Sequence, residues 1–137
     1  MLKYLLDTNI VIYVLKRRPP EIKFRFNDNA QRMAISSITL AELYYGAEKS
    51  QKVAQNLEAI EEFVSLLPVL GYDEHASRHY GEIKAELERR GEIIGVNDLH
   101  IAAHARSRGL VLVSNNLKEL GRVPYLPCEN WIEMGHS

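Results

Sequence analysis

The chain has 137 residues, of which 46% are hydrophobic and 26% are charged, a balance typical of a folded globular protein that excludes a disordered one. No apolar run approaches the roughly 20 residues that span a bilayer, and the N-terminus lacks the pattern of a secretory signal. Since the single cysteine, Cys128, has no partner within the chain, we expect a cytoplasmic protein without membrane contact, built as one domain over residues 1–137.

Apolar patterning along the chain predicts strands that alternate with helices. Strands are expected at residues 1–6, 33–36, 69–70, 110–113 and 125–126. Helices are expected at residues 9–16, 21–27, 39–47, 53–67, 76–90 and 98–108. Because such alternation places helices on both faces of a sheet, we expect an α/β fold with a mostly parallel central sheet.

Positive charge gathers in the first third of the chain. The net charge of −1 does not by itself indicate a nucleic-acid partner. Residues 1–40, however, carry seven basic side chains against three acidic ones. Such a cluster could meet phosphate groups, although charged clusters are more often solvated surface.

Polar stretches follow two of the predicted strands. The sequence DTN at residues 7–9 comes directly after the first strand, and SNN at 114–116 comes after the strand at 110–113. Ligands of parallel sheets bind outside the carboxyl ends of the strands, where these stretches are expected to lie. Asp7 suits two interpretations equally well, as the N-cap of the next helix or as a site residue.

Two further acidic residues begin predicted helices. Glu42 follows Thr39 by three positions, a capping-box spacing, yet its side chain would lean back toward the helix start, where a cleft is expected. Asp98 shares a helix face with the small apolar residues three, four and seven positions later. A carboxylate at the edge of a core needs a partner, which could be a metal ion or the helix dipole.

Other motifs indicate little chemistry of their own. The pairs His75/His79 and His100/His104 have the i, i+4 spacing that can bind a transition metal, but the latter pair aligns with polar residues, so we expect it to be exposed to solvent. Neither a phosphate-binding glycine loop nor a serine-hydrolase turn occurs. The remaining candidate is a carboxylate site, whose hard oxygens select Mg²⁺ or Mn²⁺ for phosphoryl chemistry.

Four segments, in order, resemble the PIN-domain nucleases, and particularly the VapC toxins of bacterial toxin–antitoxin pairs. They are LLDTN at residues 5–9, SSITLAELYYG at 36–46, NDLHIAAHA at 97–105, and LVSNN at 112–116 with its continuation at 122–123 and 129–131. Each segment is weak evidence alone, whereas four in sequence are specific. The resemblance implies a PIN-like three-layer α/β/α sandwich and a single nuclease domain.

The resemblance also implies a Mg²⁺- or Mn²⁺-dependent endoribonuclease with Asp7, Glu42 and Asp98 as its catalytic acidic site. Asp7 and Asp98 would hold the metal directly, and Glu42 would bind it as well or orient and deprotonate the attacking water. Cleavage would leave a 5′-phosphate and a 3′-hydroxyl. This interpretation favours site roles over capping roles for all three residues.

The pattern departs from the family at its fourth acid. Many relatives place an aspartate in the segment that matches residues 114–116, where this chain has asparagines. Glu119 is the nearest carboxylate and a candidate metal ligand. Asn115 and Asn116 are candidates to bind metal-bound water or phosphate.

The resemblance further implies an RNA substrate and protein partners. The subgroup that this chain most resembles cuts initiator tRNA in the anticodon loop. Lys16, Arg17 and Arg18 would hold the RNA backbone by charge. The toxin is expected to form a homodimer and to be inhibited by a VapB-type antitoxin. Candidate antitoxin contacts, for which core packing is an equal explanation, are Tyr44, Tyr45, Phe63 and Leu67.

Two alternatives stay open at this point. A phosphatase that forms an aspartyl phosphate would use Asp7 as nucleophile, but enzymes of that type want a second aspartate at the position that Asn9 occupies. A non-catalytic RNA-binding or partner-binding domain would use the acidic residues only as helix caps.

Overall fold

One parallel sheet forms the centre of the molecule. The structure, a computed structural model, describes residues 1–132. Its strands pair in the order β3-β2-β1-β4-β5, and every pairing is parallel. The strands are β1 (Tyr4–Leu6), β2 (Met33–Ser36), β3 (Val69–Leu70), β4 (Val111–Val113) and β5 (Cys128–Glu129). The predicted α/β class with a mostly parallel sheet is confirmed.

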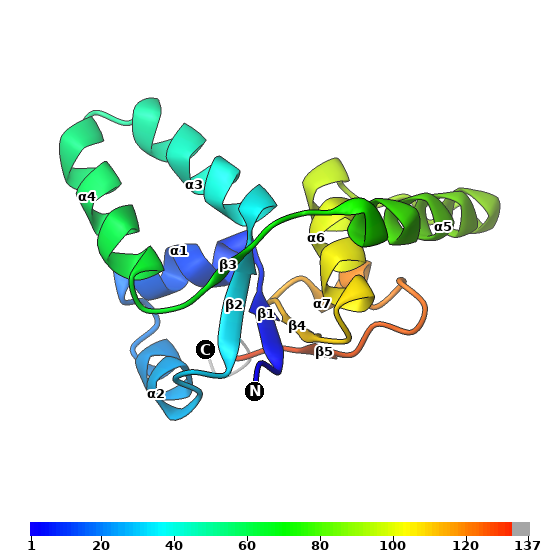
Figure 1. Ribbon diagram of the computed structural model, residues 1–137, viewed down its shortest axis with the longest axis horizontal. Helices are drawn as coiled ribbons and strands as arrows, with labels where there is room; N and C mark the ends of the chain where they lie inside the picture. Colours follow the sequence, from blue (N-terminus) through cyan, green and yellow to red (C-terminus); the bar gives the residue numbers. More distant parts are fainter. Residues whose placement is uncertain (133–137) are drawn as a thin grey trace.

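Helices cover both faces of this sheet. They are α1 (Thr8–Lys16), α2 (Glu21–Asp28), α3 (Ser37–Glu48), α4 (Val53–Val64), α5 (Glu74–Arg90), α6 (Val96–Ser107) and α7 (Leu117–Leu120). The first four lie on one side of the sheet and the last three on the other (Figure 1), which confirms the three-layer α/β/α arrangement. Within residues 1–132, none of these helices has the length and apolar character to cross a membrane.

The two faces of the sheet carry separate hydrophobic cores. Tyr4 and Leu6 of β1 point into the core beneath α1 to α4, while Leu5 between them points into the core beneath α5 to α7. Both leucines are completely buried, which stabilises the fold by roughly 1.5–3 kcal/mol for each side chain. A strand buried on both faces needs apolar residues at every position, and this explains the continuous apolar run that predicted β1.

The start of α3 differs from its prediction. The helix begins at Ser37, and Ser36 is its N-cap, with its hydroxyl accepting a hydrogen bond from the Ile38 amide at 3.0 Å. Thr39 is therefore a buried residue of the first turn, and the predicted Thr39–Glu42 capping box is wrong. The reason is that the last residue of β2, Ser36, already provides the side-chain cap of the helix.

The last strand also lies elsewhere than predicted. The expected strand at 125–126 is replaced by β5, three residues further along the chain. Tyr125 has a φ of 60° and a side chain that is 92% exposed, a backbone conformation that no strand residue adopts. The short helix α7 was not predicted, because four residues are too few to show a helical period.

The predicted solvent exposure of His100 and His104 is wrong. His104 is completely buried, with Nδ1 2.7 Å from the Ser36 hydroxyl oxygen. His100 is half-buried and stacks on Tyr80 at 4.2 Å between ring centroids. The polar side of α6 is covered by α5 and by the start of α3. The burial of the two histidines therefore depends on neighbouring elements, which the helical periodicity of α6 alone does not reveal. His104 thereby ties α6 to the N-cap of α3.

Replacing His104 by alanine is expected to lower the free energy of unfolding by about 2–4 kcal/mol, because the change opens a cavity and removes a buried hydrogen bond. Urea denaturation monitored by circular dichroism measures this loss. His75→Ala is the matched control, since His75 is exposed on α5, and it should change stability by no more than about 0.5 kcal/mol. Equal stability of the two variants would contradict the assigned role of His104.

Candidate active site

Four acidic side chains gather at the carboxyl edge of the sheet. Asp7 follows β1 and begins α1, Glu42 lies on α3 after β2, Asp98 lies in the first turn of α6, and Glu119 lies on α7 after β4. The starts of α1 and α3 meet at this edge in Figure 1. The charges of Glu42 and Asp98 raise the pKa of Asp7, and those of Glu42 and Glu119 raise the pKa of Asp98, so the structure brings the predicted acidic residues to one edge of the sheet.

Asp7 is both a helix cap and a member of this acidic cluster. Its carboxylate accepts a hydrogen bond from the Ile10 amide at 2.9 Å and another from the Ser114 side chain. The side chain is only 3% exposed. Burial raises the pKa of Asp7 from 3.8 to about 6 against these two hydrogen bonds, and the negative charges of Asp98 and Glu42 raise it further. The two interpretations of Asp7 therefore apply together.

Glu42 is held by hydrogen bonds from two other elements. Its Oε1 accepts from the Thr8 hydroxyl at 2.5 Å, and its Oε2 accepts from the Asn97 amide at 2.8 Å. Asn97 directly precedes the helix expected at residues 98–108, but α6 begins at Val96 with Gly95 as its N-cap. The Asn97 side chain is therefore free to cross to α3. The result is a Glu42 carboxylate fixed between the starts of α1 and α6.

Asp98 and Glu119 lie side by side. Burial raises the pKa of Asp98, and the negative charges of Glu119 and Glu42 raise it further, against one hydrogen bond from Asn116. The Asn116 amide also donates to Oε2 of Glu119 at 3.2 Å. Glu119 thus lies near Asp98 as a candidate fourth acid, and Asn116 forms hydrogen bonds with both carboxylates. Asn115, by contrast, donates to the Tyr13 hydroxyl at 3.2 Å.

The charge of this cluster is not balanced within the protein. No ion pair between described residues involves Asp7, Glu42, Asp98 or Glu119. Burial is the main cause of the raised pKa values of Asp7 and Asp98, and the negative charges of neighbouring carboxylates add to it. Carboxylate and amide oxygens are the donors that suit Mg²⁺ or Mn²⁺. The donor set therefore fits a divalent cation, although in residues 1–132 no three His, Cys, Asp or Glu side chains are arranged to hold one ion.

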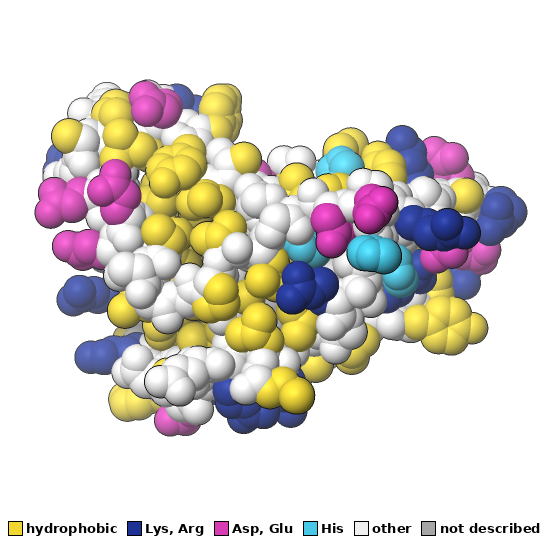
Figure 2. Space-filling view, in the orientation of Figure 1, with side chains coloured by type: hydrophobic (Ala, Val, Ile, Leu, Met, Phe, Trp, Pro, Cys, Tyr) yellow, Lys and Arg dark blue, Asp and Glu magenta, His cyan; other side chains and the backbone are white. Residues whose placement is uncertain are grey.

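An open groove of about 590 Å³ leads to the carboxylates. It is lined by Thr8, Asn9, Ile12, Ile38, Ala41, Glu42, Tyr45, Gly46, Lys49, Asn97 and Asp98. Figure 2 shows the molecule hollowed between the part formed by α3 and α4 and the part formed by α5 and α6. A groove of this size and openness admits an extended chain such as single-stranded RNA.

The predicted basic residues lie at the far end of α1. Lys16, Arg17 and Arg18 are exposed and stand roughly 15 Å along the helix axis from Asp7, given a rise of 1.5 Å per residue. Lys16 lines a second groove whose wall includes Glu42. It is the one of the three that the structure places on the same surface as an acidic site residue.

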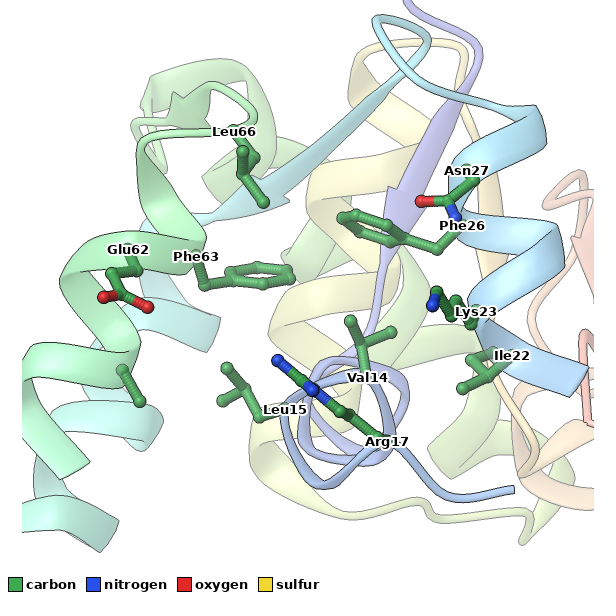
Figure 3. A pocket seen from close by; sticks show the side chains of 11 residues that line it. Val14, Leu15, Arg17, Ile22, Lys23, Phe26, Asn27, Glu62, Phe63 and Leu66 are labelled. Atoms are coloured by element: carbon green, nitrogen blue, oxygen red, sulfur yellow. The ribbon is translucent and has the colours of Figure 1, made fainter. Parts of the chain in front are cut away.

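Arg17 occupies a different pocket. This pocket lies between α1, α2 and α4, where Phe26 and Phe63 face each other at 5.7 Å between ring centroids (Figure 3). None of the four carboxylates lines it. The position of Arg17 therefore does not support a contact with the scissile part of an RNA substrate. Arg17 lines this separate pocket instead.

Comparison with known proteins agrees with this geometry. A family model described as the PIN domain matches residues 4–124. The chain is 62% identical to "Ribonuclease VapC2" of Haemophilus influenzae over 132 residues, which cover 96% of this chain and all of that protein. The chain belongs to the PIN-domain family, among the VapC ribonucleases. The predicted family membership and nuclease class are confirmed.

One further relative and one solved structure show which PIN-domain proteins this chain is similar to. It is 53% identical to the "tRNA(fMet)-specific endonuclease VapC" of Salmonella typhimurium, over 96% of this chain and 99% of that protein. Its fold matches a crystal structure of DNA-bound VapBC from Salmonella typhimurium with a TM-score of 0.93, at 53% identity, covering 96% of this chain and all of that one. A VapC ribonuclease is favoured over the phosphatase and the non-catalytic domain.

Three residues of this VapC site were not predicted as functional. Thr8 and Asn97 position Glu42, and Ser114 donates to Asp7. Each is adjacent in sequence to a predicted acid or lies in a strand-end polar stretch. This position in the sequence is the signal that could have identified the three residues. Only the structure shows which carboxylate each side chain contacts.

Proposed function

We propose that this chain is the toxin of a type II toxin–antitoxin pair, an endoribonuclease that needs Mg²⁺ or Mn²⁺ and cuts a tRNA in its anticodon loop. The observation that carries the proposal is the gathering of four carboxylates without a positive partner at the carboxyl edge of a parallel sheet. A protein stabilises such a cluster poorly by itself, whereas a divalent cation stabilises the ionised forms.

In the proposed site, Asp7 and Asp98 would hold the cation, and the Glu119 carboxylate adds negative charge beside Asp98. A bound divalent cation supplies an activated water and neutralises charge on the scissile phosphate. Glu42 orients the attacking water and accepts its proton on a carboxylate oxygen, since Thr8 and Asn97 fix both of these oxygens in place. In-line attack leaves a 5′-phosphate and a 3′-hydroxyl.

The substrate proposal rests on one relative and on the shape of the groove. The Salmonella typhimurium relative is named for specificity toward tRNA(fMet), and we extend this specificity to the present chain. Loop nucleotides are unpaired, so their bases and backbone can enter the open groove as a single strand. A base-paired duplex could not enter it in this way. Lys16, beside the neighbouring groove, is placed to contact the RNA backbone.

A protein partner is proposed from the structural relatives. The matching structures from Salmonella typhimurium and Rickettsia felis are VapBC complexes bound to DNA. We therefore infer a VapB-type antitoxin for this chain and a homodimeric toxin, acting in the cytoplasm where tRNA is found. Of the predicted antitoxin contacts, Phe63 and Leu67 are buried in the core, whereas Tyr44 and Tyr45 are exposed.

Cleavage mapping on cellular RNA tests this function. Purified protein is incubated with total bacterial RNA, with Mg²⁺ or with EDTA, and the new 5′ ends are sequenced. The proposal expects ends concentrated in the anticodon loop of initiator tRNA, seen only with Mg²⁺. Cuts in mRNA or rRNA alone would overturn the substrate, and intact RNA under all conditions would overturn the nuclease function.

Replacing Glu119 by glutamine tests the fourth acid. Because Glu119 adds its charge beside Asp98, we expect Mg²⁺ affinity, measured as the concentration for half-maximal cleavage, to fall by roughly tenfold to a hundredfold. The rate at saturating Mg²⁺ should fall less. Glu88→Gln, an exposed change on α5, is the control. An unchanged Mg²⁺ requirement in Glu119→Gln would remove this residue from the site.

A further inference from the structure

A large aromatic side chain stands exposed on the wall of the groove that leads to the carboxylates. Tyr45 is 66% exposed and lines the same groove as Glu42 and Asp98. It follows Glu42 by three positions on α3, and residues with this spacing are neighbours about 5–6 Å apart on a helix surface. The ring therefore lies one helical turn from the proposed point of cleavage.

Folding does not account for this exposed ring. Two of the buried core residues of α3, Leu43 and Ala47, are two positions before and after Tyr45, and this spacing places them on the opposite side of the helix. At Gly46, which also lines the groove, an added Cβ atom would meet nothing within 4 Å, so the groove wall is open at the position after Tyr45. Such a ring offers a flat apolar face to a ligand in the groove.

A positive charge accompanies the ring. Lys49 is the C-cap residue directly after α3, four positions beyond Tyr45, with Nζ 4.9 Å from the centroid of the Tyr45 ring. Among the described residues that line this groove, Lys49 is the one with a positive charge. Elsewhere along the groove the charge is negative, from Glu42 and Asp98. A phosphate that enters here is therefore attracted at one end, beside Tyr45.

We propose that Tyr45 and Lys49 form a nucleotide subsite, in which one unpaired base stacks on the Tyr45 ring and Lys49 contacts a backbone phosphate next to the scissile one. The proposal rests on the proposed RNA cleavage and assigns part of the substrate binding to named residues. Aromatic stacking with a nearby cation is how proteins bind single-stranded nucleic acid, because every base has a face that can stack. A protein contact would use the ring equally well but would leave the adjoining charge pattern unexplained.

Base stacking can be measured without cleavage. The probe is an anticodon stem-loop RNA in which single loop bases are replaced by 2-aminopurine, whose fluorescence falls when it stacks. Titration in EDTA with wild-type protein is expected to quench one loop position. Tyr45→Phe should keep the quench, while Tyr45→Ala should abolish it and weaken binding roughly fivefold to a hundredfold. Tyr125→Ala, which removes a ring that is 92% exposed outside the groove, is the matched control.

The Lys49 contact has its own measurement. For Lys49→Gln, the slope of log affinity against log salt concentration should become shallower by about 0.7, the value for one phosphate contact on a single strand. Lys84→Gln is the control, because Lys84 also lies over a tyrosine ring, at 5.6 Å from Tyr80, but outside the groove. Equal slopes for wild type and Lys49→Gln would overturn the assignment of Lys49.

The possible outcomes separate this proposal from the function on which it rests. If wild-type protein neither binds the stem-loop nor cuts RNA with Mg²⁺, the proposed function fails and the subsite with it. If wild type cuts RNA and Tyr45→Ala binds the probe as well as wild type does, only the subsite fails. The subsite also fails if Tyr45→Ala leaves RNA binding intact but turns a dimer into a monomer in sedimentation, since the ring then belongs to a protein contact.

Discussion

RNA cleavage by the Asp98→Asn variant is expected to be about a thousandfold slower than by wild type, or slower still, which corresponds to roughly 4 kcal/mol of lost transition-state stabilisation. Asp98 is half-buried near two other carboxylates. Its negative charge is one of those that a bound divalent cation would neutralise. Asparagine has nearly the same shape but no charge. Single-turnover cleavage of the anticodon stem-loop RNA measures the loss.

The Asp98→Asn prediction separates a catalytic charge from a structural one. The variant should unfold at the same urea concentration as wild type, or at a slightly higher one, because the raised pKa of Asp98 means that its ionised form destabilises the fold. Glu58→Gln, an exposed change on α4, controls for altered net charge and should cut RNA at the wild-type rate. Cleavage by Asp98→Asn within tenfold of wild type would contradict the site assignment.

Asp7→Asn is expected to abolish cleavage and yet to stabilise the protein at neutral pH. The pKa of Asp7 rises from 3.8 to about 6 on folding, mainly through burial, so the folded state binds more protons than the unfolded state between these pH values. Stability therefore falls as pH rises from about 4 to 7, and the ionised carboxylate costs the fold roughly 3 kcal/mol above that range. Asparagine carries no such cost.

Thermal unfolding at several pH values tests the Asp7 prediction. In EDTA, Asp7→Asn should unfold at a higher temperature than wild type at pH 8, and the difference should vanish below pH 4, where both states of wild type are protonated. Added Mn²⁺ should stabilise wild type more than the variant, because the variant lacks one of the proposed ligands. A variant less stable than wild type at pH 8 in EDTA would show that the N-cap contact to Ile10 outweighs the buried charge.

Asp7 and Asp98 could be predicted from local sequence patterns, each for its own reason. Asp7 follows a strand whose continuous apolar run identified it as buried, and the rule for parallel sheets then located the ligand site. Asp98 stood out through the small apolar face that it shares. Glu42 was placed in the site by the family resemblance, while its own local pattern indicated a capping box that the structure does not contain.

What could not be predicted depends on contacts between elements far apart in the chain. The hydrogen bonds from Thr8 and Asn97 to Glu42 join residues 34 and 55 positions apart. The burial of His104 depends on Ser36, 68 positions away. Glu119 could be named only as the nearest carboxylate, because the short helix that carries it gives no periodic pattern. Helical periodicity reports one element at a time and contains no information about such pairs.

The requirement for a divalent cation is the most direct test of the acidic site. Cleavage of end-labelled anticodon stem-loop RNA by wild-type protein is measured first in EDTA and then with increasing Mg²⁺, and the chemistry of the new ends is determined. We predict no cleavage in EDTA, a rate that saturates with Mg²⁺, and products with a 5′-phosphate and a 3′-hydroxyl. Undiminished cleavage in EDTA, or products ending in a 2′,3′-cyclic phosphate, would contradict a cation-dependent site at Asp7 and Asp98.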